Sequence, residues 1–322
     1  MFKRTLSVVA VALAAACAIA DSVPDREALI EDLTLRSLDS IPRGGELLVT
    51  GLQISGRPVE LDLERFSVMA PDGRIVIAGA GGEREAEAPI ALFRGWVASD
   101  PESTAVLAVT PWWTQGVVST AHETYYISTG PAVENGHGTL LVTAASDVPR
   151  DDAVPGCGLV APADIEPVRR SSGAGAARSG PPPCRTARVA LDTDFSYTQR
   201  VGGDALEAAA YAMLLTAAGS EIYQRDLNVR LAVSYLRVWE DNSDPYPASG
   251  DSLTQFEDHW RVNQIHVDRD FAMLLTGRTN LPYGGVAYLD ALCSDFRGFG
   301  VVGYVRGSFR IRSLISTRAT RI

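Results

Sequence analysis

Residues Asp270 to Phe309 read DFAMLLTGRTNLPYGGVAYLDALCSDFRGFGVVGYVRGSF, and this stretch decides the fold of the second half of the chain. Its first part, Phe271 to Thr276, is a continuous apolar run, which is typical of a central strand in a parallel sheet. Upstream, Arg188 to Asp192 predicts another buried strand and Asn228 to Trp239 a long alternating one. In the long strand we expect one side to carry Val229, Leu231, Val233 and Tyr235.

Two helices are expected between these strands. Asp204 can cap the first helix, with Glu207 three residues later closing a capping box. The second helix is expected at Leu253 to Val262, capped near Asp251. The apolar residues of the first helix fall on one face, namely Leu206, Ala210, Met213, Leu214 and Ala217. Strands that alternate with helices predict an α/β arrangement with a mostly parallel sheet.

The first half of the chain has a different pattern. Between Glu46 and Tyr126, short alternating or apolar runs are separated by turn signals, which predicts an antiparallel β domain. Pro71-Asp72-Gly73 is expected to form a turn between two of these strands, because proline fixes φ and glycine accepts a positive φ. One helix is expected before them, at Asp25 to Ser37.

A linker is predicted between the two halves, at residues 147–184. This segment is rich in proline, glycine, serine and alanine, a composition that buries too little apolar surface to offset the entropy of ordering. Exposed linkers are sites of proteolysis, so Arg169-Arg170 and Arg178 are either processing sites or ordinary solvated charges.

The start of the chain and its charge bear on location and partners. Residues 1–20 combine Lys3 and Arg4, an apolar run and the small residues Ala18 and Ala20, which predicts a secretory signal peptide and an extracellular protein. The alternative is a lipid anchor at Cys17. After signal removal we expect no membrane segment. The net charge of −10 disfavours nucleic acid as a partner.

The second half resembles the reprolysin-like zinc metalloendopeptidases of the metzincin clan. The resemblance is carried by Leu275-Thr276-Gly277-Arg278, then the Gly-Gly-x-Ala segment that begins at Gly284, then Cys293. In that family a strand ending in a similar motif is followed by an antiparallel edge strand, here Gly284 to Asp290. The resemblance thus implies the upper subdomain of a metzincin peptidase.

The first half resembles the propeptide of the same peptidases. Phe93 to Val109, FRGWVASDPESTAVLAV, together with Tyr125 to Ser128, carries this second resemblance. It lies before the peptidase-like half, which is the order expected of a proenzyme.

The resemblance implies a substrate-binding role for the edge strand. An exposed edge offers unpaired N–H and C=O groups, so an extended peptide or protein segment can add to it as a further strand. An ordinary sheet edge is the alternative. The residues implied to bind substrate are Gly285, Val286, Ala287 and Tyr288.

Zinc is the cofactor that the resemblance implies. Such enzymes use HExxHxxGxxH, in which histidines supply the ligands and the glutamate the general base, and this motif does not occur in the sequence. His122, His137, His259 and His266 have no such spacing. His259 and His266 with Asp268 or Asp270 are a weaker metal-binding alternative to a solvated helix face. We therefore predict no catalytic residues and no activity.

The cysteines leave two interpretations open. Cys157, followed by Gly158, resembles the cysteine switch in which a propeptide thiolate binds the catalytic zinc. The alternative is a disulfide between Cys157 and Cys184. Within the family Cys293 would pair with a cysteine beyond the zinc motif.

We expect an α+β chain of two domains, with an antiparallel β propeptide-like domain followed by an α/β metzincin upper subdomain with an antiparallel edge strand. The expected function is that of a secreted metalloendopeptidase, truncated before its zinc motif. A secreted non-catalytic binding or inhibitory module is the alternative. The expected parts are a signal peptide at 1–20, the propeptide-like domain at 21–146, the linker at 147–184, the peptidase-like part at 185–309 and a tail unlike the family at 310–322.

Overall fold

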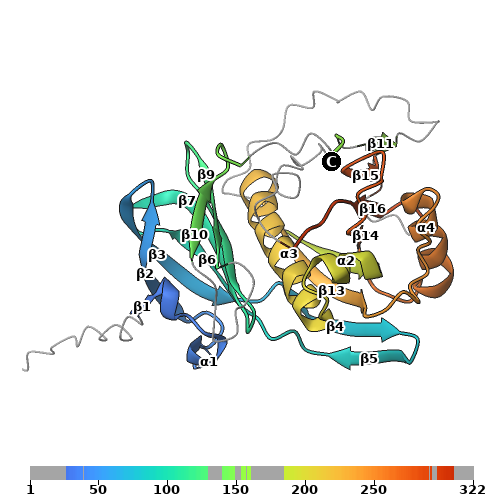
Figure 1. Cartoon of the computed structure of the whole chain (residues 1–322), viewed down its shortest axis with the longest axis horizontal. Helices are drawn as coiled ribbons and strands as arrows, with labels where there is room; N and C mark the ends of the chain where they lie inside the picture. Colours follow the sequence, from blue (N-terminus) through green and yellow to red (C-terminus); the bar gives the residue numbers. More distant parts are fainter. Residues whose placement is uncertain are drawn as a thin grey trace, which may run out of the picture.

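A computed structural model describes residues 27–38, 40–129, 140–148, 154–156, 158–160, 185–289, 291 and 296–307. These residues form two eight-stranded sheets with a long helix between them (Figure 1). Within this part of the chain, no helix is both long and apolar enough to cross a membrane.

The first sheet has the order β1-β2-β3-β6-β7-β8-β9-β10. Every neighbouring pair is antiparallel except β1 and β2, which are parallel. This is the antiparallel sheet that the short alternating runs predict. Its strands are β1 (Glu27–Leu29), β2 (Glu46–Ile54), β3 (Arg57–Phe66), β6 (Ala91–Val97), β7 (Asp100–Val109), β8 (Thr114–Ser119), β9 (Thr124–Ser128) and β10 (Leu141–Ala144).

The second sheet has the order β11-β15-β16-β14-β12-β13-β4-β5. Its five central strands run parallel, while β15 is antiparallel to β16 and β5 is antiparallel to β4. The mostly parallel sheet with an antiparallel β15 matches the expectation. Its strands are β4 (Met69–Gly79), β5 (Gly82–Ala86), β11 (Gly158–Val160), β12 (Arg185–Thr193), β13 (Val229–Trp239), β14 (Phe271–Leu275), β15 (Gly285–Tyr288) and β16 (Phe299–Val302).

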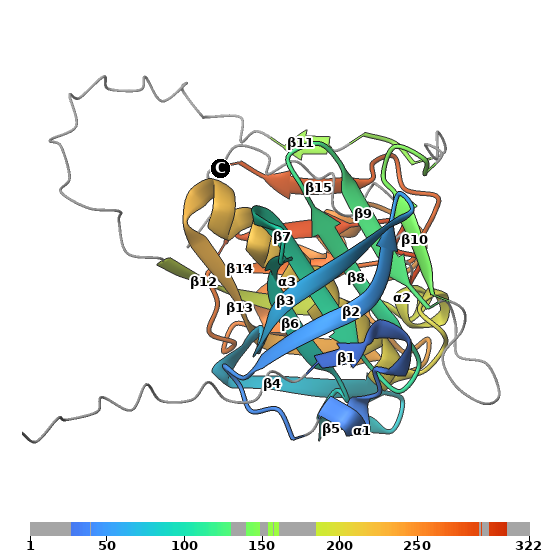
Figure 2. The ribbon, with the colours of Figure 1, turned by 90° about the vertical axis from the view of Figure 1, so that its left-hand side faces the viewer.

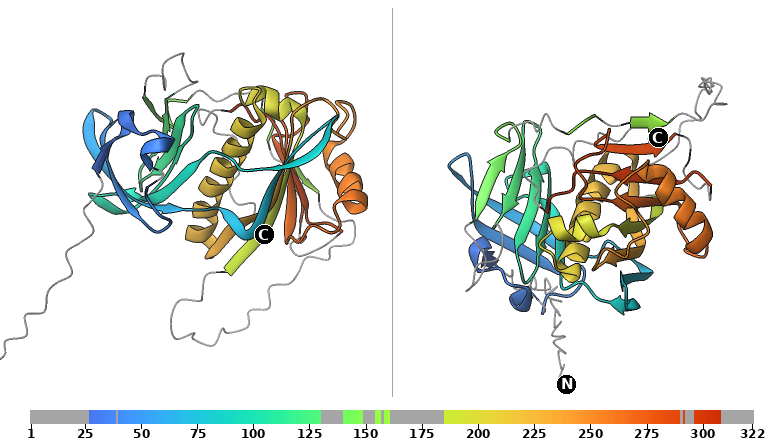
Figure 3. Two further views of the ribbon diagram at one scale, coloured as in Figure 1. Left: turned by 90° about the horizontal axis from the view of Figure 1, so that it is seen from below. Right: turned by 45° about the vertical axis from the view of Figure 1, so that its right-hand side comes forward.

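The strands β4 and β5 come from the first half of the chain but lie in the sheet of the second half. Figure 3 (left) shows this hairpin reaching across to the second sheet. The two sheets therefore do not divide at the predicted linker, and the two-domain division of the sequence analysis stays a prediction.

The helices cover both faces of the second sheet. These are α2 (Phe195–Arg200), α3 (Ala205–Leu227) and α4 (Ser252–Asn263), and before them lie a short 3-10 helix, η1 (Ile30–Asp32), and α1 (Leu35–Leu38). One apolar cluster joins α3 to residues of both sheets, among them Val106 of β7 and Val233 of β13. A second cluster joins α4 to the opposite face, through Phe256 and Trp260. A third packs η1 and α1 on the outer face of the first sheet.

Because α3 lies between two sheets, it is buried on more than the one face that its sequence suggested. Ala208, Ala209, Ala212 and Ala218 are all buried in addition to the predicted face. Small alanine side chains allow both sheets to approach the helix closely. Asp204 caps this helix as predicted, accepting hydrogen bonds from the backbone N–H groups of Leu206 and Glu207.

Three local predictions were wrong. The helix expected at Asp25 to Ser37 is replaced by β1, η1 and α1, because β1 pairs with β2 and this pairing takes up backbone hydrogen-bonding groups. Pro71-Asp72-Gly73 lies inside β4 rather than in a turn. The Glu207 side chain, which was expected to close a capping box with Asp204, instead accepts a hydrogen bond from the Trp113 indole at 3.1 Å.

The alternation predicted for β13 breaks at a β-bulge. Against β12 the register shifts between Val233 and Tyr235, so Ser234 is the extra residue. Against β4 the extra residues are 70–73 of β4, which lie between Met69, opposite Val233, and Arg74, opposite Tyr235. Leu231 and Val233 pack with α3 as expected, whereas Tyr235 packs on the α4 side. The bulge also turns Arg237 to the side where it forms the ion pair described below.

Candidate substrate-binding edge

The predicted substrate-binding residues form β15 and have strands on both sides. Antiparallel β16 pairs with Gly285, Val286 and Ala287 on one side. On the other side β11 runs parallel, with Gly158, Leu159 and Val160 opposite Val286, Ala287 and Tyr288 (Figure 2). The edge that was expected to be open is therefore paired with the protein's own chain.

The segment before β11 is fixed at the start of β15. The backbone N–H of Gly284 donates to the carbonyl oxygens of Pro155 and Gly156, each at 3.1 Å. A Cβ atom at Gly284 would lie 2.7 Å from the Pro155 oxygen, so this approach requires glycine. Val154 packs against the apolar cluster on the α4 side of the sheet. These contacts hold segment 154–156 at the start of β15, so that β11 lies beside β15 at the edge of the sheet.

Tyr288, at the end of β15, is tied to α4. Its hydroxyl donates to Glu257 Oε2 at 2.6 Å, and Arg261 pairs with Glu257 Oε1 at 2.6 Å. Burial and the Glu257 carboxylate raise the pKa of Tyr288 to about 12, so its hydroxyl stays a donor at neutral pH. Along β15, Gly285 and Val286 are buried and Ala287 is exposed.

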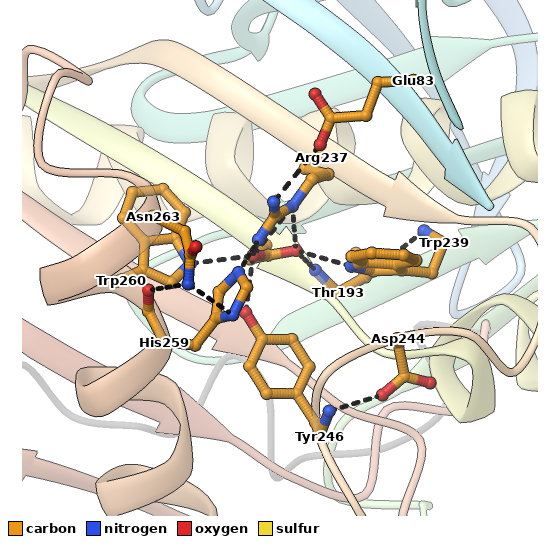
Figure 4. Close-up of polar contacts among 10 residues, drawn as sticks. Glu83, Thr193, Arg237, Trp239, Asp244, Tyr246, His259, Trp260 and Asn263 are labelled. Atoms are coloured by element: carbon orange, nitrogen blue, oxygen red, sulfur yellow. Dashed lines mark hydrogen bonds and ion pairs between the residues drawn. The ribbon is translucent and has the colours of Figure 1, made fainter. Parts of the chain in front are cut away.

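A buried polar network lies where β12 and β13 end (Figure 4). Asp192 is its centre and is fully buried. Its carboxylate accepts hydrogen bonds from Tyr246 Oη (2.6 Å), Trp260 Nε1 (2.8 Å) and Arg237 Nε (3.1 Å). Arg237 Nη2 forms the ion pair with the same carboxylate. The network joins the sheet to α4 and to the 240–250 loop.

A second buried ion pair accounts for the motif Leu275 to Arg278. Arg278 Nε lies 3.0 Å from Asp194 Oδ2, and Thr276 Oγ1 donates to the same oxygen. A Cβ at Gly277 would lie 2.2 Å from the carbonyl oxygen of Ser196, so glycine is needed there as well. The motif fixes the end of β14 against α2, and the chain continues from it into β15.

The described residues do not fit a zinc site. They contain no group of three or more His, Cys, Asp or Glu side chains able to hold a metal ion. His259 Nε2 lies 3.0 Å from Arg237 Nη2, and a second cation beside that guanidinium would be repelled. Burial, and then Arg237, lower the pKa of His259. His259 is therefore half-buried beside an ion pair, not on the solvated helix face expected from the sequence.

The other predicted ligands are dispersed. His122 is exposed in the turn between β8 and β9, and His266 is exposed beyond α4. Asp268 pairs with Arg188 Nε (2.9 Å), while Asp270 accepts from the Arg188 backbone N–H (2.7 Å). Four of the predicted residues, Cys157, Cys184, Cys293 and His137, lie outside the described residues.

The two buried ion pairs, Asp192–Arg237 and Asp194–Arg278, were not predicted from the sequence. A signal for them exists, since Asp192 and Arg237 are ionisable residues within strongly apolar strands. A charge inside such a strand needs an opposite charge nearby. Its partner, however, is a tertiary contact that strand periodicity does not identify.

Comparison with known proteins finds a similarity between the second half of the chain and a peptidase family. Residues 184–321 match the model of the reprolysin-type family described as Metallo-peptidase family M12. The predicted resemblance to reprolysin-like metallopeptidases is thus confirmed over the matched residues, and the match extends into segment 310–322.

The chain is also similar to a solved structure, the crystal structure of metalloproteinase-II from Bacteroides fragilis. The sequences are 10% identical, the TM-score is 0.49, and the match covers 88% of this chain and 84% of that chain. No curated protein matches the chain.

Proposed function

We propose that this chain is a secreted, metalloendopeptidase-like protein whose peptide-binding edge, β15, is occupied by its own residues 158–160. The parallel pairing of β11 with β15 is the observation that carries the proposal. We propose further that, once residues 158–160 leave β15, the chain holds an extended peptide there without hydrolysing it.

The chemistry of a sheet edge supports peptide binding at β15. A strand edge recognises an extended segment through main-chain hydrogen bonds, which do not depend on the sequence of that segment. β11 is such a segment. The occupant proposed for a freed β15 is therefore an extended peptide or protein segment.

The proposal that the chain does not hydrolyse peptides rests on the residues available to bind zinc and to act as a general base. Zinc peptidases need ligands that leave one coordination position open for water, and a general base beside it. The sequence lacks HExxH, and the described residues bring together no alternative set. Zinc is implied by the family alone, and no step is assigned to it.

Hydrolysis is tested by adding zinc and a set of quenched fluorescent peptides to the full chain. We expect no cleavage that a chelator abolishes. Binding of one equivalent of zinc together with chelator-sensitive cleavage would overturn the proposal of inactivity.

Peptide binding is tested by freeing the edge. A variant with proline at 158, 159 and 160 cannot donate hydrogen bonds from β11, whereas the corresponding alanine variant keeps all three N–H groups. We expect the proline variant to bind a labelled extended peptide more tightly than the alanine variant does. Equal binding by the two variants would contradict the assignment of β15 as the binding edge.

The second candidate function is that of a secreted, non-catalytic module that binds or inhibits another protein. The pairing of β11 with β15 favours this function as well. Capture of a peptide that is recovered intact after prolonged incubation with zinc would support this function. Export is tested separately by N-terminal sequencing of the mature protein, which we expect to begin at Asp21.

A further inference from the structure

The hairpin of β4 and β5 completes the second sheet on the side opposite β15. β4 pairs with β13 in parallel: Met69 lies opposite Val233 and, after a break at residues 70–73, residues 74–78 lie opposite residues 235–239. β5 then closes the edge. In Figure 1 the hairpin lies below β13, next to strands that follow it by about half the chain. Without it, β13 would be an open edge.

Polar contacts fix the register of the hairpin. Both carboxylate oxygens of Asp72 accept from the Arg188 guanidinium, at 3.0 and 2.8 Å. At the far end, Arg84 pairs with Glu240 at 2.9 Å, and the N–H of Ala80 donates to Asp241 at 2.8 Å. Exposed ion pairs contribute little to stability, so their role here is to align the strands.

The apolar side chains of β4 belong to the cores of the second half. Ile77 is fully buried in the cluster that contains Val233 and Val238. Val76 points to the opposite side, into the cluster that contains Tyr235. Glu83 of β5 reaches the buried Arg237 at 3.4 Å. The hairpin is thus part of both faces of the sheet.

The first sheet also covers α3. Trp113 packs edge-on against Tyr211, with ring centroids 6.1 Å apart, and its indole donates to Glu207. Loss of the first half would expose the alanine-rich outer face of α3 and the edge of β13 together. The face of α3 is apolar, and the edge of β13 would carry unpaired backbone N–H and C=O groups. Water can form hydrogen bonds with the strand edge but not with the apolar face.

We infer that the first half is a permanent strand donor to the second half. The edge of β13 is an interaction surface whose partner is the hairpin at residues 69–86, and this contact persists after the chain is cut between Val160 and Arg185. Proteolytic processing then yields a two-chain complex and not a free peptidase-like half. This inference does not depend on the function proposed for β15.

The inference is tested by inserting a site-specific protease sequence after Gly173 in the full chain. After cleavage, native mass measurement and gel filtration are expected to give one species that contains both fragments. Separation of the fragments in buffer without denaturant would overturn the inference.

Two glycine substitutions in the hairpin test its contribution. A Cβ at Gly73 would lie 2.4 Å from the Val233 carbonyl oxygen, whereas a Cβ at Gly81 meets nothing within 4 Å. We expect Gly73→Ala to lower the urea concentration at which the cleaved fragments separate, and Gly81→Ala to leave it unchanged. Identical behaviour of the two variants would contradict strand donation by the hairpin.

Hydrogen exchange keeps the inference testable if Gly73→Ala does not fold. In the unsubstituted protein, the amides of β13 are expected to exchange equally slowly before and after cleavage. Faster exchange across β13 after cleavage would show that the hairpin had left, and would overturn the inference.

Discussion

Arg237 and Asp192 form an ion pair inside the protein, with the guanidinium side chain 2% exposed and the carboxylate fully buried. Burial alone would lower the pKa of Arg237, but the Asp192 carboxylate more than offsets this effect and the pKa is raised. Both residues also bind neighbours from α4 and the loop before it. The pair therefore joins β12 and β13 to α4 and to the loop that precedes it.

Replacing Asp192 with asparagine should strongly destabilise the protein. The substitution keeps the size of the side chain but removes the buried counter-ion of Arg237 and leaves only the half-exposed Glu83 carboxylate at 3.4 Å. Breaking a buried ion pair costs about 3–5 kcal/mol. The measurement is the free energy of unfolding in urea.

The matched control for this prediction is Asp226→Asn. Asp226 pairs with Arg225 on the surface, and a surface pair contributes about 0–1 kcal/mol. Similar losses for Asp192→Asn and Asp226→Asn would show that the buried pair is not a major support of the fold.

His259 should make stability sensitive to mild acid. Its pKa is lowered in the folded protein, first by burial and then by Arg237. As pH falls below the unfolded value of about 6.5, the unfolded state binds the proton first, so the free energy of unfolding decreases. His259→Gln should reduce this decrease, measured by urea unfolding at a series of pH values.

His122→Gln is the control, because the His122 side chain is exposed in the turn between β8 and β9. We expect this variant to follow the unsubstituted protein throughout the series. If the free energy of unfolding of His259→Gln changes with pH as that of the unsubstituted protein does, the account of His259 is wrong.

The cap of α4 should have a measurable local effect. The Asp251 side chain accepts from the Thr254 backbone N–H at 2.8 Å. Asp251→Ala should lower stability by about 1 kcal/mol. Asp258→Ala, at an exposed position within the same helix, should change stability by less than about 0.5 kcal/mol. Thermal or urea unfolding distinguishes them, and equal effects would contradict the capping role.

The packing of α3 between two sheets predicts intolerance to larger side chains. Ala212 is fully buried, so Ala212→Leu should cost about 1–3 kcal/mol. Arg225→Leu, near the exposed end of the helix, should cost less than about 1 kcal/mol. If Ala212→Leu left the free energy of unfolding in urea unchanged, the conclusion that both sheets pack closely against α3 would be wrong.

Much of the second half was predictable because its signals are local. The strands at 188–192, 228–239 and 271–276 and the caps Asp204 and Asp251 depend on apolar runs and on capping side chains, and the structure contains all of them. The strand predicted near Gly285 is also present as β15, although β11 and not β15 forms the edge of the sheet.

The features that were missed depend on contacts between distant parts of the chain. The pairing of β4 with β13 joins residues about 160 positions apart, and strand periodicity does not specify a partner. β11 has three residues after a glycine- and proline-containing segment, so it carries almost no strand signal. The bulge at Ser234 likewise interrupts an alternation that looks continuous in the sequence.

Hydrogen exchange at β15 tests the central claim most directly, which is that the protein's own residues 158–160 occupy the peptide-binding edge. The amides of residues 285–288 are measured in the variant with three prolines at 158–160 and in the matched alanine variant. The account predicts faster exchange at β15 in the proline variant, with the amides of β13 unchanged. Equal exchange at β15 in both variants would contradict it.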